Sequence, residues 1–119
     1  MPRGWIEEGV KRVGFINIGV YSAKPDKDGE LRNVLKKISQ YMKENPDKFT
    51  ALKSRKLYTR HIGGVFGEYV DMWEFGSWEE YAEYSKIYGA DSTYAGYWSE
   101  LVELVEPSTH SWTNLIEAG

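Results

Sequence analysis

Hydrophobic and polar positions follow two different periods along this chain, and the two periods alternate. Residues 13–21 are mostly β-branched and aromatic and are apolar on both faces, which predicts a strand in the middle of a sheet. Between residues 31 and 42 the apolar positions recur at helical spacing, which predicts an amphipathic helix ended by Asn45-Pro46. The apolar stripe of this helix is Leu31, Val34, Leu35, Ile38, Tyr41 and Met42.

The next part of the chain predicts a strand followed by a glycine-rich connection. Residues 52–62 are polar on much of one face, which is typical of a strand at the edge of a sheet. Gly63, Gly64 and Gly67 then indicate a hairpin connection to the following strand.

A third strand runs directly into a helix. Residues 69–75 alternate between two faces, as in a strand. Ser77 lies three residues before Glu80, which is the spacing of a capping box at the start of a helix. The two signals together predict a strand whose end leads without a loop into a capped helix.

The second helical region is predicted to be broken in two. Residues 89–92 interrupt the first helix, and Asp91 or Ser92 would cap a second one. Pro107 stops this second helix, and residues 109–116 have the pattern of a last strand.

The resulting order of elements is β-α-β-β-α-β. This order is typical of the ferredoxin-like α+β fold, in which an antiparallel four-stranded sheet carries its helices on one face. We expect residues 1–119 to form one such domain. Because the first and third strands are apolar on both faces, the helix-free face would expose a large apolar surface. A homodimer in which two sheets face each other would cover it.

Composition narrows the classes of function. The net charge is −3 and the charged residues are interspersed, which argues against nucleic-acid binding. The local basic stretch of Lys53, Arg55, Lys56 and Arg60 is interpreted as the solvated side of an edge strand. The sequence contains no Cys, which excludes disulfides. With neither a signal-peptide pattern nor a segment of transmembrane length, we expect a cytoplasmic protein without membrane contact.

Residues 69–81 (YVDMWEFGSWEEY) carry a family resemblance. A strand that ends in Trp-Glu-Phe and runs into a helix opened by Ser-Trp-Glu-Glu resembles the dimeric α+β barrel superfamily. The resemblance covers residues 13–117. The helix of residues 97–105 (YWSELVELV), followed by a short strand, looks like the NIPSNAP-like and antibiotic-biosynthesis monooxygenase-like members in particular. Dabb-type stress proteins and haem-degrading monooxygenases belong to the same superfamily.

The resemblance implies a ligand site between the sheet and the helices. Cofactor-independent monooxygenases of this superfamily oxidise aromatic substrates in such a cleft, with Asn, Trp, Tyr and Arg side chains. Haem-degrading members use an Asn-Trp-His set and a haem-ligand His in the helical region. The predicted helices contain no His, which argues against haem degradation but leaves haem binding undecided. We expect no cofactor.

Three residues are candidates for catalysis. Asp71 shares a strand face with aromatic side chains, where a carboxylate needs a partner or a proton. Its candidate partners in a purely structural ion pair are Arg12, Arg55 and Arg60. Asn17 interrupts an apolar strand in a similar way. His61, at the end of the second strand, is either a general base or metal ligand or a hydrogen-bonded strand-end residue. Since His61 and His110 are widely separated in the sequence, no metal site is expected.

Aromatic residues are the candidate substrate-binding groups. Tyr58 and Tyr69 would donate phenolic hydrogen bonds to a bound carbonyl, and Trp73 would stack on the substrate. Tyr84 and Trp98 belong to an aromatic group in the broken helical region. This group either covers the sheet or walls a pocket whose lid is the break between the two helices.

These observations lead to two functional interpretations. The first is a homodimer that binds a small apolar or aromatic molecule, with a cofactor-independent monooxygenase-like reaction as the best enzymatic hypothesis. Asn17 and Tyr58 would then orient the substrate, and His61 or Asp71 would move a proton. The alternative is a non-catalytic, stress-associated or assembly protein of the same fold. A pocket of sufficient volume beside these polar groups would favour the first. The substrate, the reaction and any assembly beyond a dimer stay undefined.

Overall fold

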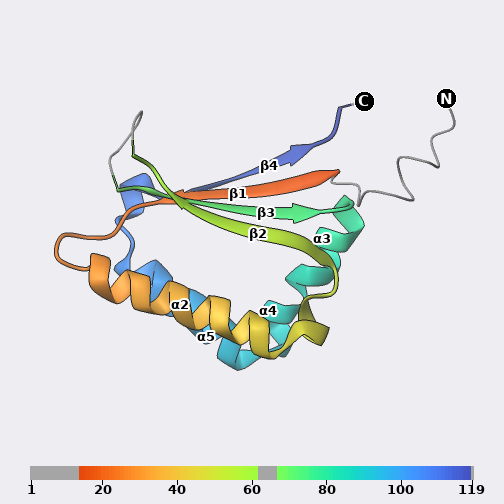
Figure 1. Cartoon of the computed structure of the whole chain (residues 1–119), viewed down its shortest axis with the longest axis horizontal. Helices are drawn as coiled ribbons and strands as arrows, with labels where there is room; N and C mark the ends of the chain where they lie inside the picture. Colours follow the sequence, from red (N-terminus) through yellow and green to blue (C-terminus); the bar gives the residue numbers. More distant parts are fainter. Residues whose placement is uncertain (1–13, 62–66, 119) are drawn as a thin grey trace, which may run out of the picture.

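Four antiparallel strands form one sheet in the computed structural model, which describes residues 14–61 and 67–118 (Figure 1). The strands are β1 (Phe15–Tyr21), β2 (Leu52–Thr59), β3 (Tyr69–Phe75) and β4 (Ser111–Ile116). The helices are α2 (Asp28–Glu44), α3 (Trp78–Ser85), α4 (Ile87–Ala90) and α5 (Ser92–Leu104). The predicted order β-α-β-β-α-β is confirmed. The second helical region, which the sequence predicts to be broken in two, consists of three helices, because the first ends already at Ser85 and the short α4 follows it.

The order of strands across the sheet is β2-β3-β1-β4. β1 and β3 are therefore neighbours in the centre and β2 is at an edge, as the sequence predicts. In the register of the central pair, Asn17 lies opposite Trp73 and Gly19 lies opposite Asp71. Residues opposite each other in an antiparallel pair share a face, so these four positions are all on one side of the sheet.

The second strand is shorter than predicted. β2 ends at Thr59 rather than at residue 62. The chain begins to turn there, since Gly67, with a φ of 80°, donates its N–H to the carbonyl of Arg60 at 3.0 Å. The remaining predicted hairpin glycines, Gly63 and Gly64, lie outside the described residues.

The last strand also begins later than predicted, at Ser111. A short 3₁₀ turn, which begins at Pro107 and ends at Thr109, precedes the strand and contains residue 109, the predicted start of the strand. The Thr109 hydroxyl secures this turn, because it donates to the carbonyl of Glu106 at 2.8 Å and accepts from the N–H of Ser22 at 3.0 Å.

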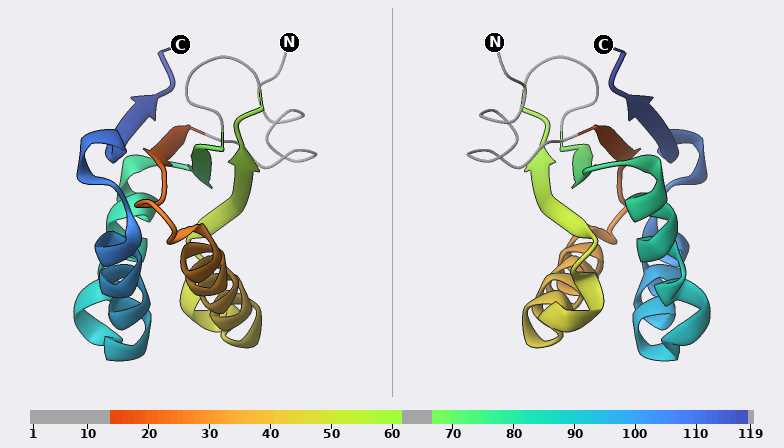
Figure 2. Two further views of the ribbon diagram at one scale, coloured as in Figure 1. Left: turned by 90° about the vertical axis from the view of Figure 1, so that its left-hand side faces the viewer. Right: turned by 90° about the vertical axis from the view of Figure 1, so that its right-hand side faces the viewer.

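The helices of the described residues lie on one face of the sheet, as predicted (Figures 1 and 2). Alternate residues of β1 and β3 face these helices and are buried. On the opposite face the central strands present Ile16, Ile18, Val20, Val70 and Met72, which are half-buried. No helix of the described part of the chain covers this second face.

α2 packs on the sheet and on α5 with the apolar stripe that the sequence predicts. Its buried residues are Leu31, Val34, Leu35 and Ile38. Full burial of an aliphatic side chain of this size contributes about 1.5–3 kcal/mol to stability. Asp28 in the first turn and Lys43 in the last turn also suit the helix dipole.

Both caps predicted in the second helical region are present. Ser77 Oγ accepts the N–H of Glu80 at 3.2 Å at the start of α3. Asp91 Oδ1 accepts the N–H groups of Thr93 and Tyr94, both at 3.1 Å, at the start of α5. Of the two candidate caps of the second helix, Asp91 is therefore the one used.

Asp91 also ties the start of α5 to the end of α2. Its Oδ2 accepts hydrogen bonds from the Tyr41 hydroxyl and from Lys48 Nζ, the latter at 2.8 Å. The hydrogen bond from Lys48, followed by that from Tyr41, holds the pKa of the Asp91 carboxyl well below its usual range. The cap is therefore a charged group held in a fixed place where the two helices meet.

The interpretation of the basic stretch along β2 as a solvated face is wrong for Arg55, whereas Lys56 is exposed as expected. Arg55 faces the helices because it lies opposite Trp73 in the register, and its side chain is only 7% exposed. Each base of the stretch has an acidic partner: the pairs are Lys53–Glu80, Arg55–Asp71, Lys56–Glu74 and Arg60–Glu68.

Candidate functional site

An ion pair lies buried between the sheet and the helices. Arg55 Nε donates to Asp71 Oδ1 and Arg55 Nη2 donates to Asp71 Oδ2, both at 2.8 Å, so the pairing is bidentate. The Tyr21 hydroxyl donates to Oδ2 at 2.8 Å, and Ser39 Oγ accepts from Arg55 Nη1 at 3.2 Å. The network thus connects β1, β2, β3 and α2. Of the three arginines considered for Asp71, Arg55 is the partner.

The groups around this ion pair determine the protonation state of Tyr21 and add to the attraction on Arg55. The Asp71 side chain has no exposed surface. Burial, and then the negative charge of Asp71, raise the pKa of Tyr21 far above its ordinary value, so Tyr21 acts as a neutral donor. The Arg55 guanidinium lies over the Trp73 ring, with Cζ 4.7 Å from the ring centroid, and 5.9 Å from the centroid of Trp98. Such desolvated cation–π contacts add to the attraction of the carboxylate.

A cavity of about 220 Å³ lies on the helix-facing side of the sheet, and Trp73 separates it from Arg55 of the ion pair. Its lining residues are Asn17, Trp73, Tyr81, Tyr84, Tyr88 and Trp112. Strands β1, β3 and β4 form one wall, and α3 and α4 form the other. The Nε1 of Trp73 is buried and has no hydrogen-bond partner among the described residues. A buried donor of this kind costs free energy unless a bound molecule or water satisfies it.

Gly19 makes room for Trp112 in the cavity wall. A Cβ at Gly19 would lie 2.5 Å from the Trp112 ring, which is closer than atoms can approach. On the next pair along the same strands, Asn17 Nδ2 donates to Asn114 Oδ1 at 2.7 Å. Trp112 was not among the predicted site residues. The signal for it is the alternation of Trp112 and Asn114 in the last strand, matching Gly19 and Asn17 in the first.

Three tyrosine hydroxyls form a chain at the helix side of the cavity. The Tyr84 oxygen is 2.8 Å from that of Tyr88 and 2.6 Å from that of Tyr94. Burial raises the pKa of all three phenols, so the chain is neutral at ordinary pH. The Tyr84 ring also packs on Trp73, with centroids 5.3 Å apart.

The structure brings part of the predicted site together. Asn17, Trp73 and Tyr84 all line the cavity. Trp98 does not line the cavity but packs on Trp73, with ring centroids 5.9 Å apart. Asp71 lies two register positions from the Asn17–Trp73 pair, and therefore on the same face of the sheet.

Three other predicted site residues lie elsewhere. Tyr58 is 50% exposed on β2, on the face away from Arg55. The Tyr69 hydroxyl donates to Asp28 Oδ1 at 2.7 Å. His61 is exposed and follows the end of β2. None of these three side chains lines the cavity.

His110 forms a hydrogen bond with the Trp112 side chain. Trp112 Nε1 donates to His110 Nε2 at 2.8 Å, so that nitrogen has to be unprotonated. Burial lowers the pKa of His110 below its ordinary value, which keeps the ring neutral. One wall of the cavity therefore depends on the protonation state of His110.

Neither a metal cluster nor a membrane helix is found in the described part of the chain. No three His, Asp or Glu side chains within residues 14–61 and 67–118 are placed to bind a metal ion. Within the same residues, no helix combines the length and the apolar character needed to cross a membrane.

Comparison with known proteins reveals similarity in structure only. No protein-family model matches the chain, and no curated protein matches it. A NIPSNAP family protein from Agrobacterium tumefaciens is 16% identical and has a TM-score of 0.66 over 87% of this chain and 92% of that one. A Caulobacter crescentus protein proposed to be an antibiotic biosynthesis monooxygenase is 15% identical, with a TM-score of 0.65 over 95% and 98% of the two chains.

A third similar structure carries information on assembly. It is a dimeric protein of unknown function and ferredoxin-like fold from Bacteroides fragilis, 14% identical, with a TM-score of 0.59 over 86% of this chain and 94% of that one. At such identities the likeness shows the fold alone. The comparisons therefore confirm the ferredoxin-like α+β fold that the resemblance implies.

Removing one member of the buried ion pair should lower the stability of the protein. Asp71→Ala leaves the Arg55 charge buried and unpaired, and we expect the free energy of unfolding to fall by about 3–5 kcal/mol in urea denaturation. The double variant Arg55→Met/Asp71→Leu removes both charges and should recover part of the loss. Asp47→Ala, which removes an exposed acid, serves as the control. A double variant less stable than Asp71→Ala would contradict this explanation.

Acidification should weaken the hydrogen bond between Trp112 and His110 and thereby lower the stability of the protein. Because the pKa of His110 is lower in the folded protein than its ordinary value of 6.5, the unfolded chain binds more protons as the pH falls through 6.5. Stability should therefore decrease below that pH, until the folded-state pKa is passed. The His110→Gln variant should lose this component of the pH dependence. Proton NMR of the imidazole checks the premise, and a His110 pKa at or above 6.5 would refute it.

Proposed function

We propose that the protein is a homodimeric α+β barrel that binds a small, largely apolar or aromatic molecule in the cavity between its sheet and helices α3 and α4. The observation that carries the proposal is Trp73 Nε1, a buried donor without a partner among the described residues, on a side chain that lines this cavity. A ligand acceptor atom placed at this donor would supply the hydrogen bond that the protein leaves unmade.

The volume of the cavity limits the size of the ligand. At about 220 Å³ it is smaller than the roughly 300–1,000 Å³ of pockets for drug-sized ligands, so one ring or two fused rings would fill it. The rings of Tyr81, Tyr88 and Trp112 offer stacking surfaces. The Asn17 amide, held in place by Asn114, would orient a polar substituent of the ligand.

An enzymatic role would be a cofactor-independent monooxygenase-like reaction. The aromatic cavity and the name proposed for the Caulobacter neighbour support it. In such a reaction, an activated CH₂ group of the substrate and O₂ give a carbonyl group and water. Asn17 and Trp73 would hold the substrate. Asp71 would serve as the base only by giving up a hydrogen bond to Arg55 or Tyr21, and His61 does not line the cavity.

One observation favours the alternative, a non-catalytic assembly or stress-associated protein of this fold. Both oxygens of Asp71 are engaged, in a geometry that suits a structural ion pair. In that case the small cavity would hold a ligand or water without turning it over, and the protein would act through its assembly.

The proposed dimer rests on the uncovered face of the sheet. Ile16, Ile18, Val20, Val70 and Met72 form an apolar row on the two central strands, and Glu74, opposite Ile16, bounds this row at one end. A second copy of the chain would bury this row against its own in an isologous interface. The dimeric Bacteroides neighbour of the same fold supports this arrangement.

Binding in the cavity is tested by two probes of nearly the same shape. 1-Indanone carries a carbonyl acceptor and indane does not, so calorimetry should show tighter binding of the ketone. Trp73→Phe removes the Nε1 donor and should weaken binding of 1-indanone by about three- to tenfold while changing that of indane less.

The matched control is Trp78→Phe, because Trp78 is 53% exposed and does not line the cavity. It should leave both affinities unchanged. Equal binding of the two probes by the wild-type protein, or no binding of either, would remove the basis of the proposed site.

The dimer is tested by Ile18→Lys, which places a charge in the centre of the uncovered face. Light scattering should give a dimer mass for the wild-type protein and a monomer mass for the variant, because an unpaired buried charge opposes association. Val102→Lys on α5 is the control, since Val102 is already 53% exposed and should tolerate lysine in the dimer. A monomeric wild-type protein would contradict the proposal.

A further inference from the structure

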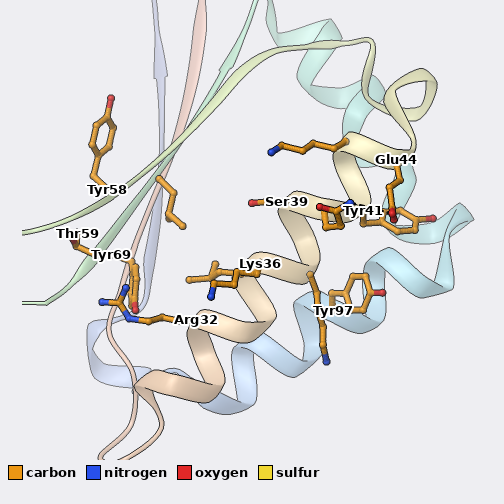
Figure 3. A pocket seen from close by; sticks show the side chains of 14 residues that line it. Arg32, Lys36, Ser39, Tyr41, Glu44, Tyr58, Thr59, Tyr69 and Tyr97 are labelled. Atoms are coloured by element: carbon orange, nitrogen blue, oxygen red, sulfur yellow. Dashed lines mark hydrogen bonds between the residues drawn. The ribbon is translucent and has the colours of Figure 1, made fainter.

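A groove with a volume of about 860 Å³ lies between α2 and the edge strand β2 (Figure 3). α2 packs against α5 and leaves the β2 side open. At one end of the groove the Tyr69 hydroxyl donates to Asp28, and Arg32 Cζ lies 5.5 Å from the Tyr69 ring centroid. Tyr41 and Glu44 lie at the other end (Figure 3). No residue lines both this groove and the aromatic cavity.

The α2 side of the groove carries an excess of positive charge. Its lining includes the four bases Arg32, Lys36, Lys37 and Lys43 but only one acid, Glu44. Arg32 is paired with Asp28 and Lys37 with Glu100. Lys36 and Lys43 have no ion pair among the described residues. They are seven residues apart, so they lie on the same side of the helix, about 10 Å apart along its axis.

The side facing these bases is apolar. Leu57 faces α2 because it lies opposite Asp71 in the register, yet it is 38% exposed. Thr59 continues this exposed side of β2, whereas Leu35 of α2 lines the groove but is only 3% exposed. Ser39 points toward β2 within the groove, but its hydroxyl already accepts a hydrogen bond from Arg55 (Figure 3). The lining thus combines an apolar surface with two cations that lack partners.

From this combination we propose that the groove binds a single-chain anionic amphiphile, such as a free fatty acid. Its hydrocarbon chain would lie along Leu57 and the methyl group of Thr59, and its carboxylate would lie at Lys36 or Lys43. The stretch of α2 from residue 32 to residue 44 is about 18 Å long, which accommodates an extended acyl chain of medium length. Charge complementarity selects the anion, and the exposed apolar surface selects the chain.

Three probes separate these two contributions. Laurate has both the chain and the charge, lauryl alcohol has only the chain, and butyrate has the charge with a short chain. In calorimetry at low salt and below the micelle concentration, laurate should bind with one molecule per protein chain. The alcohol and butyrate should each bind at least about tenfold more weakly, and salt should weaken laurate binding.

Two variants assign this binding to the groove. Lys36→Glu/Lys43→Glu should weaken laurate binding by about tenfold or more, because both unpaired cations are reversed. Leu57→Ser should weaken it about fivefold through loss of apolar contact. The control is Lys27→Glu/Lys86→Glu, which makes the same change in net charge at exposed sites outside the groove. It should bind laurate like the wild-type protein.

Several outcomes would overturn the proposal. One is equal binding of laurate and lauryl alcohol, and another is unchanged binding by the Lys36→Glu/Lys43→Glu variant. Loss of laurate binding in Trp73→Phe would assign the fatty acid to the aromatic cavity instead. Binding only to anionic phospholipid vesicles, or to an acidic peptide in place of laurate, would mean that a different partner occupies the groove.

Discussion

The ion pair between Arg55 and Asp71 is the interaction on which the arrangement of this protein depends. A buried charge pair is stable only when its geometry is good and its remaining polar atoms are satisfied. Here two 2.8 Å hydrogen bonds join the pair, and Tyr21 and Ser39 complete it. The pair thereby fixes the edge strand β2 against the central strands and against α2.

The same pair determines which groups are free to act in the cavity. Arg55 lies over Trp73, whose ring lines the cavity, and so holds the position of that ring. Since the oxygens of Asp71 are engaged, the polar groups on the side chains that line the cavity include the Asn17 amide, the Trp73 indole and the hydroxyls of Tyr84 and Tyr88. These groups donate and accept hydrogen bonds but do not titrate near neutral pH, which suits binding better than proton transfer.

Much of the fold follows from the sequence, because it depends on local periods and caps. The alternation in residues 69–75 and the caps at Ser77 and Asp91 gave the correct elements. The site is predicted less well from the sequence, because it depends on which residues of neighbouring strands lie opposite each other. The periodicity of a strand does not define this register. Trp112 belongs to the cavity only because it lies opposite Gly19. From the sequence, Arg55 is one of three candidate partners of Asp71, and only its register, opposite Trp73, distinguishes it from the other two.

The break in the second helical region explains why so many tyrosines meet at one place. An unbroken helix would place the side chains of residues 84 and 94 about 15 Å apart along its axis. Because Asp91 starts a new helix, the hydroxyls of Tyr84 and Tyr94 come within 2.6 Å, and Tyr88 joins them. Tyr84 and Tyr94 are buried and Tyr88 is 40% exposed, but each hydroxyl finds its partner in another phenol rather than in a charged group. An ion pair thus positions the sheet side of the cavity, and neutral hydrogen bonds position the helix side. A pH change that leaves the Arg55–Asp71 pair intact therefore affects the cavity through His110, whose ring accepts the hydrogen bond from Trp112.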